Sequence, residues 1–283
     1  VVEKETPVEV APAPAKVAPA PAKADVDNLI ENPDAGIATM DGVEKEVSGD
    51  AATIDGNSYG TLDEALNNAK DGNEVVLQKN HTGNIKIAEW IKLNLNGKKI
   101  EGNVEVDLSG KKGDTATSQD GETAVEKKVE IVDGTITGGT DSGVKIIGAD
   151  VKLENVNVTG NSSQGNGGGI YVEDGSVEII GGSISGNSAA GTNERGAQGG
   201  GGIYAKNSDV VLTDTTISGN TVTGSGKDGG GIHVEWSELK ITDSIVSGNK
   251  AANGAGIFMA DTDVPKNETE HTITKTTIEN NTA

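Results

Sequence analysis

The sequence predicts an all-β fold in which the chain winds into a solenoid of parallel strands, and three observations lead to this class. Short runs of alternating apolar and polar residues recur from about residue 90 to residue 283. The strand-bearing part of each repeat keeps its length, while the segment after it varies. Glycine supplies 41 of the 283 residues and aromatic residues only 2%, so Val, Ile and Leu must fill the interior. Such a chain is stable only when successive turns stack on each other.

The repeat has four marked positions. Apolar residues stand at offsets 0, 2 and 7 and Asn stands at offset 10, as in Val177, Ile179, Ile184 and Asn187. Seven copies fit this template, beginning at Leu93, Val129, Val151, Val177, Val210, Leu239 and His271. One copy carries Gly139 in the Asn position.

An apolar anchor residue lies upstream of the later copies. Four anchors lie seven residues before offset 0, at Val144, Ile170, Ile203 and Ile232. Ile257 lies fourteen residues before His271, so residues 261–270 are predicted to be an insertion. We expect three short strands in each turn, with equivalent strands of successive turns paired about 4.8 Å apart, over about eight turns.

The Asn residues at offset 10 predict a ladder of side chains along one corner of the solenoid. Its expected members are Asn103, Asn161, Asn187, Asn220, Asn249 and Asn281. Because an amide carries both donors and an acceptor, each side chain can bond the turn backbone and the amide of its neighbour. We therefore interpret this column as structural and not as a ligand site.

The segments before the repeats predict a linker and a cap. Residues 1–25 contain "VAPAPAK" twice, which is typical of an extended Ala/Pro-rich linker, and residues 26–50 are polar with no assigned structure. Residues 51–283 are expected to form the solenoid. Thr61 and Glu64 form a capping box, and apolar residues follow at helical spacing, which predicts a helix over 61–70 that covers the first apolar layer.

Composition excludes several functions. The chain has 23 Lys and Arg residues and 44 Asp and Glu residues, and the resulting net charge of −21 disfavours nucleic acid as a partner. No apolar run is long enough for a membrane helix, so we expect no membrane insertion by this segment. His81, His233 and His271 stand at unrelated template positions, and we expect no metal site and no cofactor. Residues 261–270 are acidic enough for weak calcium binding, although a solvated loop is the plainer interpretation.

The outward positions after each anchor form columns across the turns. The first column holds the rings of Tyr171, Tyr204, His233 and Phe258, and Trp236 stands in a third column. Two interpretations stay open for the rings: they stabilise neighbouring strands, or they form a strip that contacts sugar rings or the apolar surface of a partner. The second column, with Glu173, Lys206 and Glu235, suits a ladder of opposite charges better than a catalytic cluster, and no catalytic residue is assigned.

The repeats also resemble a known group of proteins. The segments "GGGIYV", "GGGIYA", "GGGIHV" and "GAGIFM", of which the first three are followed by "SGN", resemble the right-handed parallel β-helix proteins of the pectate-lyase-like superfamily and the repeats of polymorphic outer-membrane-protein adhesins. Those adhesins pair a Gly-Gly-small-Ile motif with Phe-x-x-Asn, where this chain has Ile184, Ile217 or Val246 in place of Phe. The resemblance implies a right-handed coil and an extracellular or cell-surface location.

These observations favour a bacterial cell-surface or secreted adhesin-like β-helix whose partner is a glycan, the matrix or a surface protein of a host or neighbouring cell. Two alternatives remain: a polysaccharide lyase or hydrolase on the same scaffold, and a purely structural stalk or surface-layer component. The last turn, "TTIENNTA", is followed by no capping element, so we also expect further repeats or another chain to cover that end.

Overall fold

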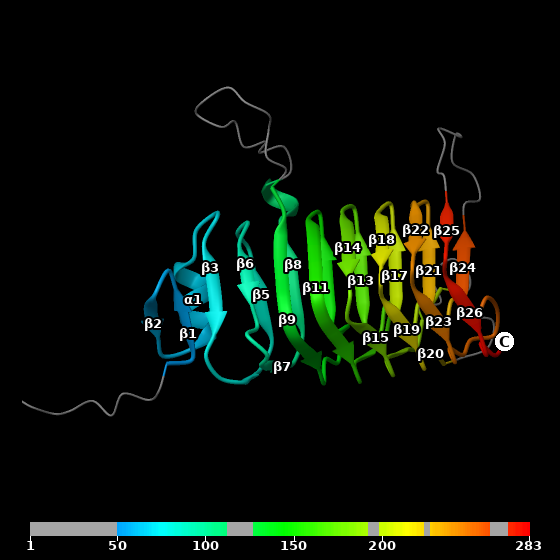
Figure 1. Ribbon diagram of the computed structural model, residues 1–283, viewed down its shortest axis with the longest axis horizontal. Helices are drawn as coiled ribbons and strands as arrows, with labels where there is room; N and C mark the ends of the chain where they lie inside the picture. Colours follow the sequence, from blue (N-terminus) through cyan, green and yellow to red (C-terminus); the bar gives the residue numbers. More distant parts are fainter. Residues whose placement is uncertain (1–49, 112–126, 192–197, 224–226, 261–270) are drawn as a thin grey trace, which may run out of the picture. The chain divides into compact units, whose positions relative to one another are not determined.

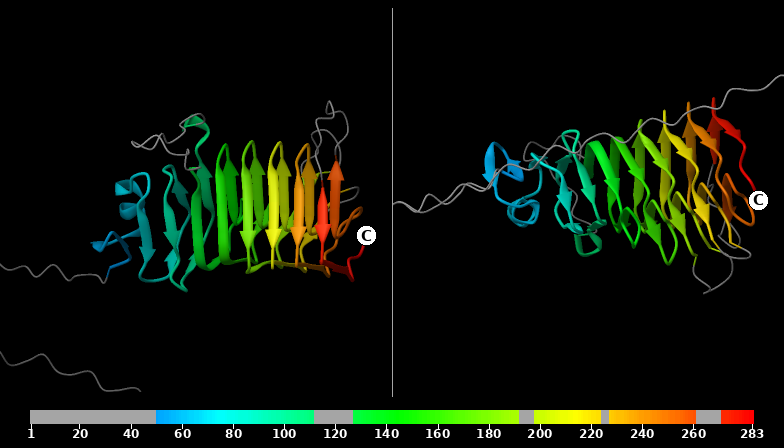
Figure 2. Two further views of the ribbon diagram at one scale, coloured as in Figure 1. Left: turned by 45° about the horizontal axis from the view of Figure 1, so that its top comes forward. Right: turned by 90° about the horizontal axis from the view of Figure 1, so that it is seen from below.

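The computed structural model describes residues 50–111, 127–191, 198–223, 227–260 and 271–283. Within them the chain forms a stack of coils whose strands run side by side from turn to turn (Figures 1 and 2). The linker over residues 1–25, nearly all of the polar segment 26–50 and the calcium hypothesis for 261–270 lie outside the described residues. Ser109–Lys111 form a short 3₁₀ helix.

Two large sheets build the coil, and a small third sheet adds to three of its turns. The first sheet consists of β5 (Ile85–Ile87), β8 (Val104–Asp107), β10 (Val144–Ile147), β13 (Ile170–Glu173), β17 (Ile203–Lys206), β21 (Ile232–Glu235) and β24 (Ile257–Ala260). We call it the anchor sheet, because every strand begins with the anchor residue of its turn. A small third sheet contains β12 (Ser162–Ser163), β16 (Ser188–Ala189) and β20 (Thr221–Val222).

The largest sheet bends along its length, so most turns contribute two segments to it. The first row is β2 (Asn57–Tyr59), β1 (Ala52–Ile54), β3 (Glu74–Leu77), β6 (Lys92–Asn94), β9 (Val129–Thr137), β11 (Asp150–Thr159), β14 (Ser176–Ile180), β18 (Asp209–Thr213), β22 (Leu239–Thr242) and β25 (Thr272–Thr274). The second row is β4 (His81–Thr82), β7 (Lys99–Glu101), the distal halves of β9 and β11, β15 (Ser183–Ser185), β19 (Thr216–Ser218), β23 (Ile245–Ser247) and β26 (Thr277–Glu279).

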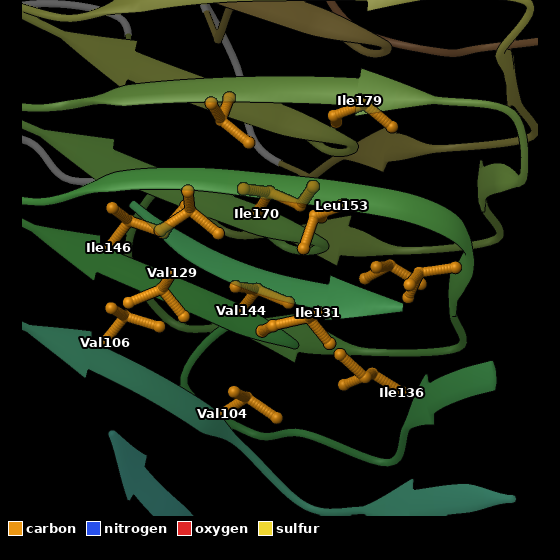
Figure 3. Close-up of a cluster of buried hydrophobic side chains, with 14 of the residues drawn as sticks. Val104, Val106, Val129, Ile131, Ile136, Val144, Ile146, Leu153, Ile170 and Ile179 are labelled. Carbon is orange, nitrogen blue, oxygen red and sulfur yellow. The ribbon is translucent and has the colours of Figure 1, made fainter. Parts of the chain in front are cut away.

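The interior is an aliphatic column shared by all turns. The buried core cluster of the described residues consists of Ala, Val, Leu and Ile side chains. In Figure 3, Val104, Val144 and Ile170 from successive anchor strands lie above one another inside the coil. Burial of each such side chain contributes about 1.5–3 kcal/mol, and only the stacking of turns provides that burial.

The register of the strands confirms the anchor residues. Val144 pairs with Ile170, Ile170 with Ile203, Ile203 with Ile232, and Ile232 with Ile257. The same column continues backward through two residues that the template did not include, Val104 and Ile85. The parallel coil therefore begins earlier in the chain than the anchor spacing indicated.

The first template copy was placed in the wrong register. Leu93 pairs with Ile131, which is the offset-2 residue of the next copy, whereas the template had placed Leu93 at offset 0. Ile100 nevertheless pairs with Ile136, as predicted. The bend between these two positions is therefore two residues longer in this turn than in the next, and Leu95 fills it as a buried residue.

The predicted capping helix is present as α1 (Leu62–Asn68). Thr61 is its N-cap, and the Thr61 Oγ1 accepts a hydrogen bond from the Glu64 backbone N at 3.0 Å. Leu62 and Ala65 are buried, and the helix packs against β1, β2, β3 and β5. It therefore covers the first apolar layer between the two main sheets.

The start of the coil region is an antiparallel hairpin, which the sequence analysis had assigned to the parallel coil. β1 pairs with β2 on one side and with β3 on the other, both in antiparallel orientation. Asp55 and Gly56, with φ of 48° and 83°, form the two-residue turn between β1 and β2. An Asp-Gly pair between two strands is a typical signal for such a turn.

The Asn ladder is continuous from Asn161 through Asn187, Asn220 and Asn249 to Asn281. In each step the backbone N and the Nδ2 of one Asn both donate to the Oδ1 of the Asn in the following turn, at 2.9–3.0 Å. Each Nδ2, that of Asn161 included, also donates to a backbone carbonyl of the preceding turn. Because the four inner side chains are nearly or fully buried, these bonds are protected from water.

Asn103 lies at the same corner but is separated from the continuous ladder. The Oδ1 of Asn103 accepts from the Thr140 backbone N at 2.8 Å, because Gly139 occupies the intervening ladder position without a side chain. The template missed one further Asn: Asn84 accepts a hydrogen bond from the Asn103 backbone N at 2.9 Å. The Gly83-Asn84 pair resembles the Gly-Asn of the later copies, and it could have identified Asn84 as a member of the ladder from the sequence.

From β10 onward, the glycine directly before each anchor is required by the ladder. A Cβ on Gly202 would lie 3.0 Å from the Nδ2 of Asn220 and 2.5 Å from the Gly231 carbonyl oxygen. The equivalent Gly231 has the same relation to Asn249. The "GGGI" and "SGN" segments therefore recur together because the backbone of the first packs against the amide of the second.

The last described turn leaves apolar side chains exposed. Ile273 and Ile278 are 40% and 47% exposed, and Met259 is 44% exposed, whereas the equivalent residues one turn earlier are fully buried. The exposed edge and apolar layer anticipated from the sequence are therefore present. That further repeats or another chain cover this end stays a prediction.

Candidate functional site

A groove lies on the outer face of the anchor sheet. Its volume is about 340 Å³, and its floor consists of outward side chains of β10, β13 and β17: Lys145, Ile147, Tyr171, Glu173, Tyr204 and Lys206. Loop residues, among them Asp141, Asn166 and Gln198, form its wall. Strand alternation turns the floor residues outward, because the residues between them are buried in the core.

The ring column predicted from the sequence is present. Tyr171 stacks on Tyr204 with ring centroids 5.5 Å apart and an interplanar angle of 23°. Tyr204 and His233 follow at 5.2 Å, and His233 and Phe258 at 5.0 Å, with tilted rings. Parallel pairing in register brings these four residues into one line.

Of the two interpretations of the ring column, the contact strip does not hold for the two central residues. Tyr204 and His233 are each only 1% exposed, whereas Tyr171 and Phe258 are partly exposed. The glycine segments before the anchors turn back over the rings: a Cβ on Gly229 would lie 2.6 Å from the Cβ of His233. The central rings therefore stabilise the sheet, and only the two ends of the column reach the surface.

The tyrosine hydroxyl groups are held by glutamates of the neighbouring column. Tyr171 donates to Glu173 Oε2 at 2.8 Å, and Tyr204 donates to Glu235 Oε2 at 2.7 Å. Burial and then these hydrogen bonds raise the pKa of both tyrosines above the ordinary value of 10.0. Both hydroxyl groups therefore stay protonated and act as donors at neutral pH.

A chain of amide hydrogen bonds joins the wall to the floor. Asn166 Nδ2 donates to Gln198 Oε1 at 2.8 Å, and Gln198 Nε2 donates to Glu235 Oε2 at 3.1 Å. Glu235 also accepts the bond from Tyr204. The loops are thereby fixed over Tyr204, and the groove is closed on this side.

The charged residues of the groove form internal pairs. Lys145 Nζ lies 3.1 Å from Asp141 Oδ2, and Lys206 Nζ lies 3.6 Å from Glu173 Oε1. The Lys206 ammonium also lies 5.8 Å from the ring centroid of Trp236. The alternating charge ladder expected for Glu173, Lys206 and Glu235 is thus partly formed.

Trp236 occupies a corner outside the groove. Its backbone has φ of 51°, a left-handed conformation that is unusual for a bulky residue, and Asp174 and Asn207 adopt the same conformation in the turns before it. Its ring lies beneath Lys206 and is partly exposed. The structure therefore does not bring Trp236 together with the Tyr171 end of the column.

His233 is a buried imidazole, and among the described residues neither ring nitrogen has a hydrogen bond of good geometry, although the Asp228 carbonyl lies near the ring. Burial lowers the pKa of His233, although the Asp228 carbonyl and carboxylate and the Glu235 carboxylate oppose part of this effect. Because the ring is enclosed by Tyr204 and Phe258, it is not available as a metal ligand or a general base at the surface.

A second hollow of about 450 Å³ lies at the corner between the anchor sheet and the largest sheet. Carboxylates of successive turns line it, including Asp150, Asp174, Glu178 and Asp209, together with Lys128. Lys128 lies 3.5 Å from Glu178. Among the described residues, no three His, Cys, Asp or Glu side chains are arranged to hold a metal ion.

The sequence pattern could have identified some of the residues that line the groove but not others. Lys145 precedes Tyr171 in the same outward column, so the register alone could have identified it. Asp141, Asn166 and Gln198 lie in the loops after each Asn, whose paths carry no periodic signal. The wall that closes the groove therefore became visible only in the structure.

The chain matches a known protein family. A family model described as a right handed beta helix region matches residues 119–283, which is more than half of the chain, and the chain belongs to this family. Neither the curated protein sequences nor the solved structures give a significant match. The coil is thus a right-handed parallel β-helix, as the repeats had suggested. Among the described residues no helix has the length and apolar character needed to span a bilayer.

Proposed function

We propose that this β-helix is an adhesin-like module of the bacterial cell surface or of secreted proteins, and that it contacts glycans through the groove beside Tyr171. One observation carries the proposal: a partly exposed aromatic ring lies in a groove that is lined mostly by polar and charged side chains, several of which are held in place by hydrogen bonds and ion pairs. Sugar rings pack their apolar faces on aromatic side chains, while fixed polar groups meet the hydroxyl groups at the rim.

The groove is better suited to binding than to turnover. The carboxylates of Glu173 and Glu235 already accept hydrogen bonds from tyrosines, and Glu173 also faces Lys206. Glycoside hydrolysis needs two carboxyl groups that are free to reach the glycosidic oxygen and the water or anomeric carbon. Groups that are engaged with protein donors do not meet this requirement.

The test is a screen of the protein against glycans, matrix proteins and bacterial surface fractions. Wild type is compared with Tyr171→Ala, with Tyr171→Phe, and with Phe258→Ala as the control at the opposite end of the same column. We expect Tyr171→Ala to lose binding, Tyr171→Phe to retain most of it, and Phe258→Ala to bind as wild type. Unchanged binding by Tyr171→Ala, with its fold intact by circular dichroism, would contradict the groove. Absence of any binding would favour the structural stalk.

A polysaccharide lyase or hydrolase is the second candidate, and the carboxylate-lined hollow favours it. Its test is the release of reducing ends or unsaturated sugars from a panel of polysaccharides. Activity that is lost in Asp174→Asn or Asp209→Asn but kept in Tyr171→Ala would place catalysis in the hollow. Surface labelling of the cells that produce the protein tests the proposed location.

A further inference from the structure

The groove is closed at one end, and this limits what it can hold. The hydrogen-bonded chain from Asn166 through Gln198 to Glu235 covers Tyr204, so a ligand cannot extend along the ring column beyond Tyr171. The floor spans only three strands, β10, β13 and β17, or about 10 Å at the usual strand spacing. The volume of about 340 Å³ lies at the lower end of the range for ligand sites.

Tyr171 is the only partly exposed aromatic side chain in this groove among the described residues, and its ring is the platform on which a sugar could pack. One face of its ring packs against Tyr204, so the opposite face is turned toward the β10 turn, where the column continues with Lys145. Lys145 and Asp141 stand beside this platform and provide a donor and an acceptor. A single sugar ring on Tyr171 would therefore have polar partners at its edge.

The electrostatics of the groove favour a neutral ligand. Its two lysines are matched by two carboxylates, Asp141 and Glu173, at 3.1 and 3.6 Å. An acidic sugar would have to displace a carboxylate that remains in the groove and repels it, on a chain whose net charge is −21. A neutral sugar can accept from the lysines and donate to the carboxylates without breaking either pair.

We propose that the groove recognises the end of a neutral glycan, one or two sugar residues long, with the terminal ring on Tyr171. This rests on the proposed function, because it names the class of ligand for the same groove. It also assigns Gln198 as the residue that sets the length of the site, since its bond to Glu235 keeps the wall over Tyr204.

The experiment is calorimetric titration of the protein with neutral oligosaccharides of glucose, galactose, mannose and N-acetylglucosamine, each as mono-, di- and hexasaccharide. Oligogalacturonates of the same lengths serve as the matched acidic series for galactose. For at least one neutral series we expect the hexasaccharide to bind within about twofold of the disaccharide. We expect the oligogalacturonates to bind at least about tenfold more weakly than the best neutral disaccharide. Gln198→Ala should improve hexasaccharide binding relative to the disaccharide, because the wall no longer fixes the end of the groove.

The outcomes separate this inference from the proposed function. A hexasaccharide that binds more than tenfold tighter than its disaccharide would overturn recognition of a glycan end, and preferred binding of oligogalacturonate would overturn the neutral ligand. In both cases glycan binding itself would stand. Absence of binding to every sugar, with binding to a matrix or cell-surface protein in the screen, would overturn the inference and leave adhesion in place.

Discussion

Replacement of Asn220 by alanine is the sharpest test of how the coil is held together. Asn220 is fully buried, and its Oδ1 accepts hydrogen bonds from the backbone N and the Nδ2 of Asn187, both at 3.0 Å. Its Nδ2 donates to the Ile184 carbonyl at 2.9 Å and to Asn249 Oδ1 at 3.0 Å. Alanine removes all four bonds and leaves buried partners of two neighbouring turns without them.

A buried hydrogen bond contributes about 1 kcal/mol net, and a buried group left without a partner costs about 1–3 kcal/mol. We therefore expect Asn220→Ala to lower the free energy of unfolding by about 4 kcal/mol. Asn281→Ala is the matched control, since it removes three comparable bonds at the end of the ladder. Asn281 is partly exposed, so water can replace its bonds, and we expect a loss of about 1 kcal/mol.

The assay is urea denaturation followed by far-ultraviolet circular dichroism. The slope of the transition must be compared between variants, because a solenoid can unfold in parts and then a single free energy is not defined. Hydrogen exchange on both sides of Asn220 adds a local measure of the same effect. Equal losses for Asn220→Ala and Asn281→Ala, or a loss below about 1 kcal/mol for Asn220→Ala, would refute the idea that buried amide bonds tie the turns together.

Three further predictions follow from the geometry. Gly202→Ala should destabilise the protein by about 3 kcal/mol, because its Cβ would lie 2.5 Å from a carbonyl oxygen of the next turn. Gly219→Ala, with φ of 63° and its nearest neighbour at an ordinary contact distance of 3.9 Å, should cost only about 1 kcal/mol, and equal midpoints in urea would contradict this order. His233→Phe should reduce the loss of stability on acidification from pH 7.5 to 5.5. The pKa of His233 is lowered in the folded state, so the unfolded state takes up the proton first, and the stability of the wild type falls as the pH drops through about 6.5. An unchanged pH dependence of stability in the variant would refute this. Thr61→Ala should cost about 1 kcal/mol by removing the cap bond to the Glu64 backbone N, and a thermal unfolding midpoint equal to that of wild type would argue against a structural role for this helix.

The periodic part of the fold could be predicted because each repeat meets the same requirements. From β10 onward, the residue that starts an anchor strand is apolar and follows a glycine, and the corner position three residues after offset 7 carries an amide. These local rules placed Ile170, Ile203 and Ile232 in one column and Asn187, Asn220 and Asn249 in another, as the structure has them. They also place Tyr171 beside Tyr204 in the outward column, as the strand pairing has them.

Errors arose where several registers satisfied the same pattern. Ile91, Leu93 and Leu95 are all apolar at alternate positions, so counting could not decide which pair opens the first copy. The choice depends on how many residues the bend of that turn takes up, and only the packing against β9 decides this. The hairpin at Ala52–Tyr59 was missed although its Asp-Gly turn was visible, because the repeat was extended over it.

The sequence by itself determined the coil, its aliphatic interior and its amide corner, since these depend on contacts between equivalent positions of successive turns. The tertiary structure alone decided which outward residues meet solvent. Gln198 bonds to Glu235 beside Tyr204, and the backbone at Gly229 packs against His233, so these two rings are buried, whereas Tyr171 stays partly exposed. The contact between Gln198 and Glu235 joins residues far apart in the sequence, and no periodicity within the repeats encodes it.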